Sequence, residues 1–135
     1  MSTILKWAAE RGSRRVVVGG HSAGSHLAAM LLHSDWSKKE PNFNLLHGLV
    51  HISGVFDLTP LVETYVNEPL KLDKAQSKLF SPLHQLDYLR RTVSAKRIKQ
   101  LVVVGEYDSN EFKRQTRAYS QVGSFQRQKF TRFIK

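Results

Sequence analysis

The stretch VVVGGHSAGSHLAAMLL, residues 16–32, decides the fold of this 135-residue chain. A run of valines leads into two glycines, and an Ala- and Leu-rich segment begins directly after Ser22. β-Branched residues without polar alternation are typical of a strand that is buried on both faces of a parallel sheet. We therefore expect such a strand over residues 14–19 and a helix over residues 23–33, joined by a sharp turn at Ser22.

The rest of the chain repeats this alternation of strands and helices. Further strands are expected over residues 48–53 and 100–105, and a fourth strand is expected to begin within residues 128–134. Amphipathic helices are expected over residues 3–11 and 109–122. Strands that alternate with helices predict an α/β fold with a mostly parallel sheet and flanking helices.

Local signals mark where several helices begin and end. The first helix is expected to end at Gly12 and to bury one side. That side carries Ile4, Leu5, Trp7 and Ala8. Thr59 is expected to cap a helix that starts at Pro60. Asp73 and Gln76 predict a capping box before a short helix.

The composition excludes several classes of protein. The chain has no cysteine, which rules out disulfides and thiolate chemistry. It has no apolar run near the ~20 residues of a membrane-spanning helix, and no signal-peptide core. The net charge is +10, but the basic residues are scattered rather than gathered in a stripe, so neither a nucleic acid nor a membrane is the expected partner. Without internal repeats, residues 1–135 are expected to form a single domain.

Residues 20–24 match Gly-x-Ser-x-Gly, the nucleophile elbow, and they stand between a strand and a helix as that motif requires. The elbow predicts that the Ser22 hydroxyl projects above the sheet. Gly20 and Gly24 are expected to let strand and helix pass closely, because a Cβ at either position would clash. The amide of Ala23, at the start of the helix, is expected to point at a developing oxyanion. The alternative is a glycine-rich turn in which the serine is incidental.

A serine nucleophile needs a base, and the base needs an acid that orients it. In hydrolases with this elbow the chain order is serine, acid, histidine. Asp108 follows the expected third strand and is the favoured acid, whereas its alternative role is to cap the helix that begins near Ser109. Asp57 also follows a strand, but it is expected to shape the loop beneath the pocket.

The histidine base is the difficulty, because none of the six histidines follows Asp108. His21 neighbours Ser22 in a strand and faces away from it. His84 is the one histidine that a loop movement could bring within reach. The base is therefore expected to be missing from this chain.

Four segments together carry a more specific resemblance. They are GHSAGSHLAAMLLHSDW, HISGVFDLTPLVETYVNEPLKLD, SPL and LVVVGEYDSNEFKRQT. From about Trp7 to Tyr119 the chain resembles the kynurenine formamidases (arylformamidases), which are α/β-hydrolases related to hormone-sensitive-lipase-like esterases. The resemblance implies hydrolysis of N-formyl-L-kynurenine to L-kynurenine and formate in tryptophan catabolism, with Ser22 as nucleophile, Asp108 as triad acid and Ala23 in the oxyanion hole. It also implies a cytoplasmic enzyme without metal or cofactor that acts on a small molecule, commonly as a homodimer.

Two elements of that family are missing from the chain. A His-Gly-Gly-x-Trp motif should lie well upstream of Ser22, and an Asp-His-Phe-like motif with the catalytic histidine should follow Asp108. The resemblance therefore implies an incomplete α/β-hydrolase domain over residues 1–135, with activity lost or impaired. The alternatives are a non-catalytic remnant that binds a partner and a carboxylesterase for small acyl groups on the same scaffold.

Overall fold

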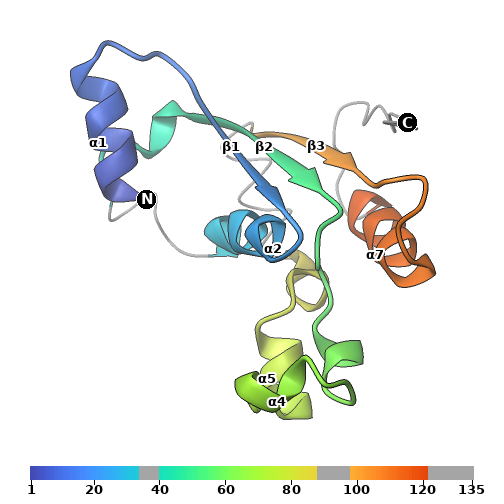
Figure 1. The fold of residues 1–135 in the computed structure, drawn as a ribbon. Coiled ribbons are helices and arrows are strands. Elements are labelled where there is room, and N and C mark those ends of the chain that lie inside the picture. Colours follow the sequence, from blue (N-terminus) through green and yellow to red (C-terminus); the bar gives the residue numbers. More distant parts are fainter. Residues whose placement is uncertain (34–39, 88–97, 122–135) are drawn as a thin grey trace.

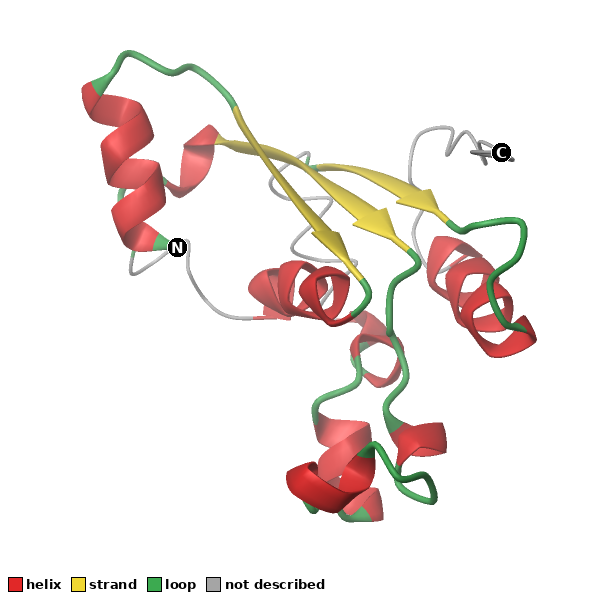
Figure 2. Ribbon diagram, in the orientation of Figure 1, coloured by secondary structure: helices red, strands yellow, loops and turns green. Residues whose placement is uncertain are grey.

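The computed structural model describes residues 1–33, 40–87 and 98–121. The strand expected within residues 128–134 lies outside these ranges. Figure 1 shows the path of the chain, and Figure 2 shows its helices and its small sheet.

The sheet has three strands in the order β1-β2-β3, and both neighbouring pairs are parallel. The strands are β1 (Val16–His21), β2 (Leu46–Ile52) and β3 (Lys99–Val103). Each lies within two residues of its expected position. The predicted α/β fold with a parallel sheet is confirmed.

The longer helices of the described chain are α1 (Ser2–Glu10), α2 (Ala23–Met30) and α7 (Asn110–Gln121). Shorter elements are the α-helices α4 (Asn67–Leu70) and α5 (Lys74–Leu79) and the 3₁₀ turns η1 (Leu31–His33), η2 (Phe43–Leu45), η3 (Thr59–Leu61) and η4 (Pro82–His84). The side chain of His51 in β2 contacts Ser25 of α2 and the ring of Tyr119 of α7. Helices α2 and α7 therefore cover the same face of the sheet (Figure 1).

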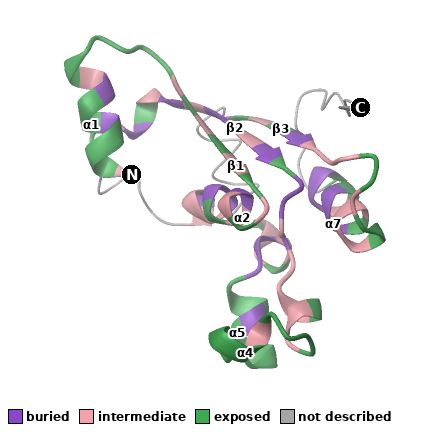
Figure 3. Cartoon of the chain, in the orientation of Figure 1, coloured by how far each residue is buried: buried purple, intermediate pink, exposed green. Residues whose placement is uncertain are grey.

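Burial on both faces of the first strand was the wrong expectation. Residues along β1 alternate between intermediate and exposed, and Val17 is 58% exposed. Val17, Ile52 and Leu101 lie on the sheet face opposite to His51, since side chains alternate along each strand and pair in register across the sheet. Figure 3 shows no buried position along β1, whereas β2 includes buried positions. Helices α2 and α7 lie on the His51 face and do not cover this second face.

Helix α1 buries a narrower stripe than its sequence predicts. Leu5 and Ala8 are buried, but Ile4 is 57% exposed and Trp7 is 55% exposed. The guanidinium of Arg11 lies 4.2 Å from the centre of the Trp7 ring, so the ring makes a cation–π contact at the surface instead of packing in the core. The helix ends as expected before Gly12, which has a φ of 72°.

The local start signals are borne out in one case and corrected in the other. Asp73 and Gln76 form both hydrogen bonds of a capping box at the start of α5. Thr59 does not cap an α-helix, because it lies inside the one-turn 3₁₀ helix η3.

The core that supports the site lies between the covered sheet face and the helices. Phe56 and Tyr119 stack with their ring centres 3.9 Å apart, and the His51 ring meets each of them edge-on. The buried cluster consists of Leu5, Ala29, Leu32, Phe43, Leu46, Leu49, Phe56, Ile98, Val102 and Tyr119. These rings pack tightly beneath the carboxyl edge of the sheet.

Candidate active site

Ser22 stands at the junction of β1 and α2 in a strained backbone conformation. Its φ is 52° and its ψ is −117°, which lies outside the left-handed helical region that a non-glycine residue occasionally adopts. The Ser22 N–H donates to the carbonyl of Ile52 at 3.0 Å, and the Ser22 carbonyl accepts the N–H groups of Ser25 and His26. The end of β2 and the first turn of α2 therefore hold the strained residue from both sides.

The two elbow glycines differ in what they make possible. A Cβ on Gly20 would lie 2.2 Å from the carbonyl carbon and oxygen of Gly24, so no side chain fits there. A Cβ on Gly24 would meet no atom within 4 Å in the described chain. The expected clash at Gly24 is therefore wrong, because its own α-carbon faces open space and the close contact is made by its carbonyl group.

Ala23 is the first residue of α2, so its N–H has no acceptor within its own helix. A free N–H at the positive end of a helix dipole is suited to an anion. The role of Ala23 in an oxyanion hole stays a prediction.

Asp108 lies in the turn that follows β3. Its Oδ2 accepts the Gly105 N–H at 2.8 Å and the hydroxyl of Ser53. The Ser53 hydroxyl lowers the pKa of Asp108 below its usual value, desolvation opposes this, and the Gly105 N–H and the nearby His21 lower it further. Asp108 is therefore held as a carboxylate, the form that a triad acid needs.

The alternative role of Asp108 as a helix cap finds no support. At the start of α7 the N–H of Phe112 donates to the hydroxyl of Ser109, at 3.4 Å. The hydrogen bonds of the Asp108 carboxylate within the described chain run to Ser53 and Gly105 instead.

Topology brings Ser22, Ser53 and Asp108 to one edge of the sheet. His21, Ile52 and Val103 are in register across the three parallel strands, so the residues that follow them leave the sheet at the same edge (Figure 2). Loops at the carboxyl edge of a parallel sheet are where α/β proteins place their sites. Ser53 was not among the site residues predicted from the sequence, although a serine directly after an apolar strand at this edge was a usable signal.

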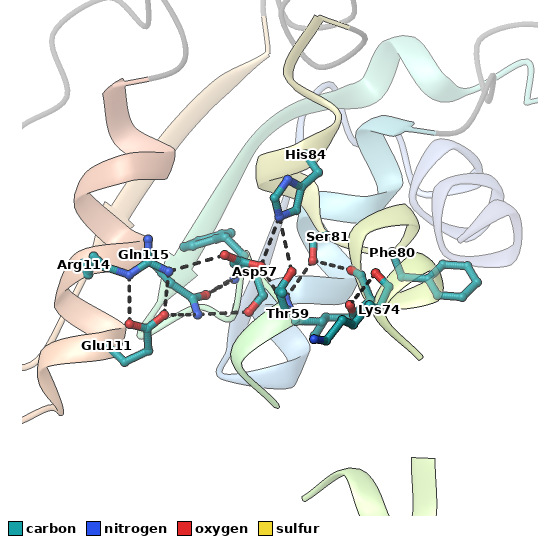
Figure 4. Close-up of polar contacts among 12 residues, drawn as sticks. Asp57, Thr59, Lys74, Phe80, Ser81, His84, Glu111, Arg114 and Gln115 are labelled. Carbon is teal, nitrogen blue, oxygen red and sulfur yellow. Dashed lines mark hydrogen bonds and ion pairs between the residues drawn. The ribbon is translucent and has the colours of Figure 1, made fainter. Parts of the chain in front are cut away.

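None of the hydrogen bonds of the described residues joins Ser22 to a histidine. His84 is engaged elsewhere, because its Nε2 lies 3.2 Å from Oδ1 of Asp57 and 3.4 Å from Oγ1 of Thr59 (Figure 4). A proton relay of the triad type uses the two ring nitrogens for two different partners. A single nitrogen shared between Asp57 and Thr59 cannot serve as such a relay.

Asp57 organises the loop between β2 and η3, as expected. One carboxylate oxygen accepts the N–H of Thr59 at 3.0 Å and faces His84, and the other lies 3.4 Å from the guanidinium of Arg114. Burial opposes ionisation of Asp57, but hydrogen bonds from Thr59 and His84 outweigh it and lower its pKa. Gln115 of α7 accepts the N–H of Asp57 and donates to its carbonyl, which closes the loop onto α7 (Figure 4).

A second histidine network lies beneath the elbow. The Ser25 hydroxyl is 3.1 Å from Nδ1 of His51, and Nε2 of His51 is 3.0 Å from Oε1 of Gln100, which also accepts the hydroxyl of Tyr119. Burial lowers the pKa of His51 to about 4, so the ring is neutral at pH 7. Ser25 and His51 are fully buried, so this serine and histidine brace the elbow and do not face substrate.

The described residues contain no group of three His, Cys, Asp or Glu side chains that could hold a metal ion. Among the same residues, no helix is long and apolar enough to cross a membrane.

Comparisons with known proteins support the resemblance to the kynurenine formamidases. No protein-family model matches the chain. The chain is 41% identical to the kynurenine formamidase of Danio rerio over 100 residues, which is 74% of this chain and 33% of that protein. It is 40% identical to the kynurenine formamidase of Salmo salar over the same length and shares. The resemblance read from the sequence is confirmed, and the chain spans about a third of the length of these relatives.

A solved structure extends the similarity to the fold. A crystal structure from Silicibacter sp., provisionally assigned as a thioesterase, superposes with a TM-score of 0.70 at 27% sequence identity. The match covers 98% of this chain and 46% of that one. The α/β-hydrolase fold implied by the resemblance is thereby confirmed.

Proposed function

We propose that this chain carries the nucleophile and the triad acid of a serine hydrolase of the kynurenine formamidase type. Its reaction is the hydrolysis of N-formyl-L-kynurenine to L-kynurenine and formate. The observation that carries the proposal is the strained conformation of Ser22 at the junction of β1 and α2, in a chain that is 41% identical to a kynurenine formamidase.

The proposed chemistry has two steps. The Ser22 oxygen attacks the formyl carbon while a base removes its proton, and the carbonyl oxygen becomes an oxyanion beside the Ala23 N–H. The C–N bond then breaks, the amine of L-kynurenine leaves with that proton, and Ser22 keeps the formyl group as an ester. Water attacks this ester with the help of the same base and releases formate. Asp108 orients the base and stabilises its protonated form.

The base is the part that this chain does not supply. No histidine follows Asp108 in the sequence, and His84 is paired with Asp57. Removal of the base from a serine triad costs a factor on the order of 10⁶ in turnover. The 135-residue chain by itself is therefore proposed to be inactive or strongly impaired.

Further parts of the proposal concern the molecule that performs the reaction. Residues 1–135 are proposed to belong to a single α/β-hydrolase domain. The substrate is a small molecule, and serine chemistry with an acid and a base needs no metal or cofactor. A homodimer in the cytoplasm is proposed by resemblance to the formamidases.

Chemical rescue tests the proposed role of Ser22. We expect added imidazole to act as the missing base, so that hydrolysis of N-formyl-L-kynurenine by the purified chain rises with imidazole concentration. Ser22→Ala should abolish the increase, and the exposed serine variant Ser13→Ala should keep it. The proposed function is wrong if imidazole gives the same rate with wild type and Ser22→Ala, as general-base hydrolysis in solution would.

A second candidate is a carboxylesterase or thioesterase that acts on small acyl groups. The structural match to the Silicibacter protein favours it, although the sequence identity of 27% is lower than that to the formamidases. The same rescue assay with p-nitrophenyl acetate separates the two, because the formamidase proposal requires the formyl substrate to be preferred. A non-catalytic remnant would show no Ser22-dependent turnover of either substrate.

A further inference from the structure

We infer that Ser53 is a positioning residue that fixes one oxygen of the Asp108 carboxylate and leaves the other oxygen free for the base. The inference rests on the proposed function for the role of Asp108 as triad acid. The contact between Ser53 and Asp108 rests on the geometry alone.

The backbone around Ser53 aims its side chain across two strands. Ser53 directly follows β2, is 6% exposed and has a φ of 46°. Its N–H donates to the carbonyl of Val103 at 2.8 Å, so the residue is anchored to the end of β3. From this position its hydroxyl donates to Oδ2 of Asp108.

The positive φ of Ser53 supports a role for its hydroxyl. A non-glycine residue in the left-handed region costs folding free energy that glycine would not cost. Ser53 adopts this conformation despite the cost. What serine has here and glycine lacks is a hydroxyl, and this hydroxyl donates a hydrogen bond to Asp108.

Gly105 also helps to hold the Asp108 carboxylate. Its N–H donates to the same Oδ2 at 2.8 Å, and a Cβ at this position would lie 3.0 Å from that oxygen. Oδ2 thus has two donors, whereas none of the hydrogen bonds of the described residues reaches Oδ1. A histidine whose Nδ1–H donates to Oδ1 would find the carboxylate already oriented, which is the requirement for a triad acid.

Two substitutions separate this role from a purely structural one. Ser53→Ala removes the hydroxyl and keeps a side chain at positive φ, whereas Ser53→Gly removes the hydroxyl and relieves the backbone. We expect the unfolding free energy of Ser53→Gly to exceed that of Ser53→Ala. If the hydroxyl holds Asp108, both variants should nevertheless raise the pKa of Asp108 relative to wild type, because a donor to the ionised form is lost.

The measurement is a pH titration of the aspartate side-chain carboxyl carbons by ¹³C NMR on the purified chain, with Asp108→Asn to assign the signal. Ser77→Ala is the matched control, since Ser77 is also buried and its hydroxyl donates to the carbonyl of Lys74. Ser77→Ala should leave the pKa of Asp108 unchanged. An unchanged pKa of Asp108 in both Ser53 variants would overturn the inference.

Failure of the proposed function would look different. In that case imidazole rescue would not depend on Ser22, while both Ser53 variants would still raise the pKa of Asp108.

A kinetic test of the same inference uses a longer chain that contains the base. There Ser53→Ala should lower kcat with little change in KM and move the acidic limb of the kcat profile to higher pH, whereas Ser77→Ala should leave the pH profile in place.

Discussion

At the scale of single residues, the elbow depends on one glycine far more than on the other. Gly20 faces the carbonyl of Gly24 at a distance that excludes a methyl group, whereas Gly24 faces open space in the described chain. Gly20→Ala should lower the free energy of unfolding by ~1–3 kcal/mol, because overpacking forces the backbone to shift. Gly24→Ala lies in the first turn of α2, where alanine is favoured over glycine by up to ~1 kcal/mol.

Urea unfolding of the two variants followed by circular dichroism measures this contrast. We expect the midpoint for Gly20→Ala to fall below that of wild type and the midpoint for Gly24→Ala to equal or exceed it. Equal losses in both variants would mean that the close approach of strand and helix at this elbow is not as described.

At the scale of secondary structure elements, His51 connects α2, β2, β3 and α7 through Ser25, Gln100 and Tyr119. Its pKa is about 4 in the folded chain and is expected near the ordinary value of 6.5 when unfolded. The unfolded chain therefore binds a proton first as the pH falls, and folding loses stability between pH 6.5 and about 4. At full effect this loss is ~3 kcal/mol, since one pKa unit corresponds to about 1.4 kcal/mol.

Unfolding free energies of wild type and His51→Gln, measured from pH 7.5 to 4, check this expectation. Glutamine does not titrate, so the variant should lose less stability than wild type over that range. The variant is expected to be less stable at pH 7.5, because it loses ring contacts with Phe56 and Tyr119. The comparison of slopes cancels other titrating groups, including His33, whose pKa burial also lowers. Parallel pH curves for the two proteins would contradict the role given to His51.

The sequence predicts the elements better than it predicts their surroundings. Gly-x-Ser-x-Gly between an apolar run and an Ala-rich run places β1, Ser22 and α2, because strand, turn and helix are all local properties. The capping box at Asp73 is equally local. The contacts of Ser53 with Asp108 and of Ser25 with His51 join residues 55 and 26 positions apart, and no local pattern contains them. The predicted burial of Val17 was wrong for the same reason, since burial depends on which distant segments of the chain cover that face of the sheet.

At the scale of the whole molecule, the sheet is covered on one face by α2 and α7, and its other face carries exposed apolar side chains. Val17 is 58% exposed, Ile52 40% and Leu101 38%. Parallel sheets are usually covered on both faces, so these valine, isoleucine and leucine side chains are unusual in water. An apolar patch of this kind favours association or binding of hydrophobic dyes.

Polar substitution on that face should therefore change how the chain behaves in solution. We expect Val17→Thr combined with Leu101→Thr to lower the fluorescence of a bound hydrophobic dye and to shift sedimentation velocity toward the monomer, since threonine keeps the strand propensity and removes apolar surface. Tyr107→Ser is the matched control, because Tyr107 is 90% exposed but lies in the loop after β3. It should leave both signals near those of wild type. If the double variant binds dye and sediments as wild type does, the open sheet face is covered in solution, and association through it is not a property of this chain.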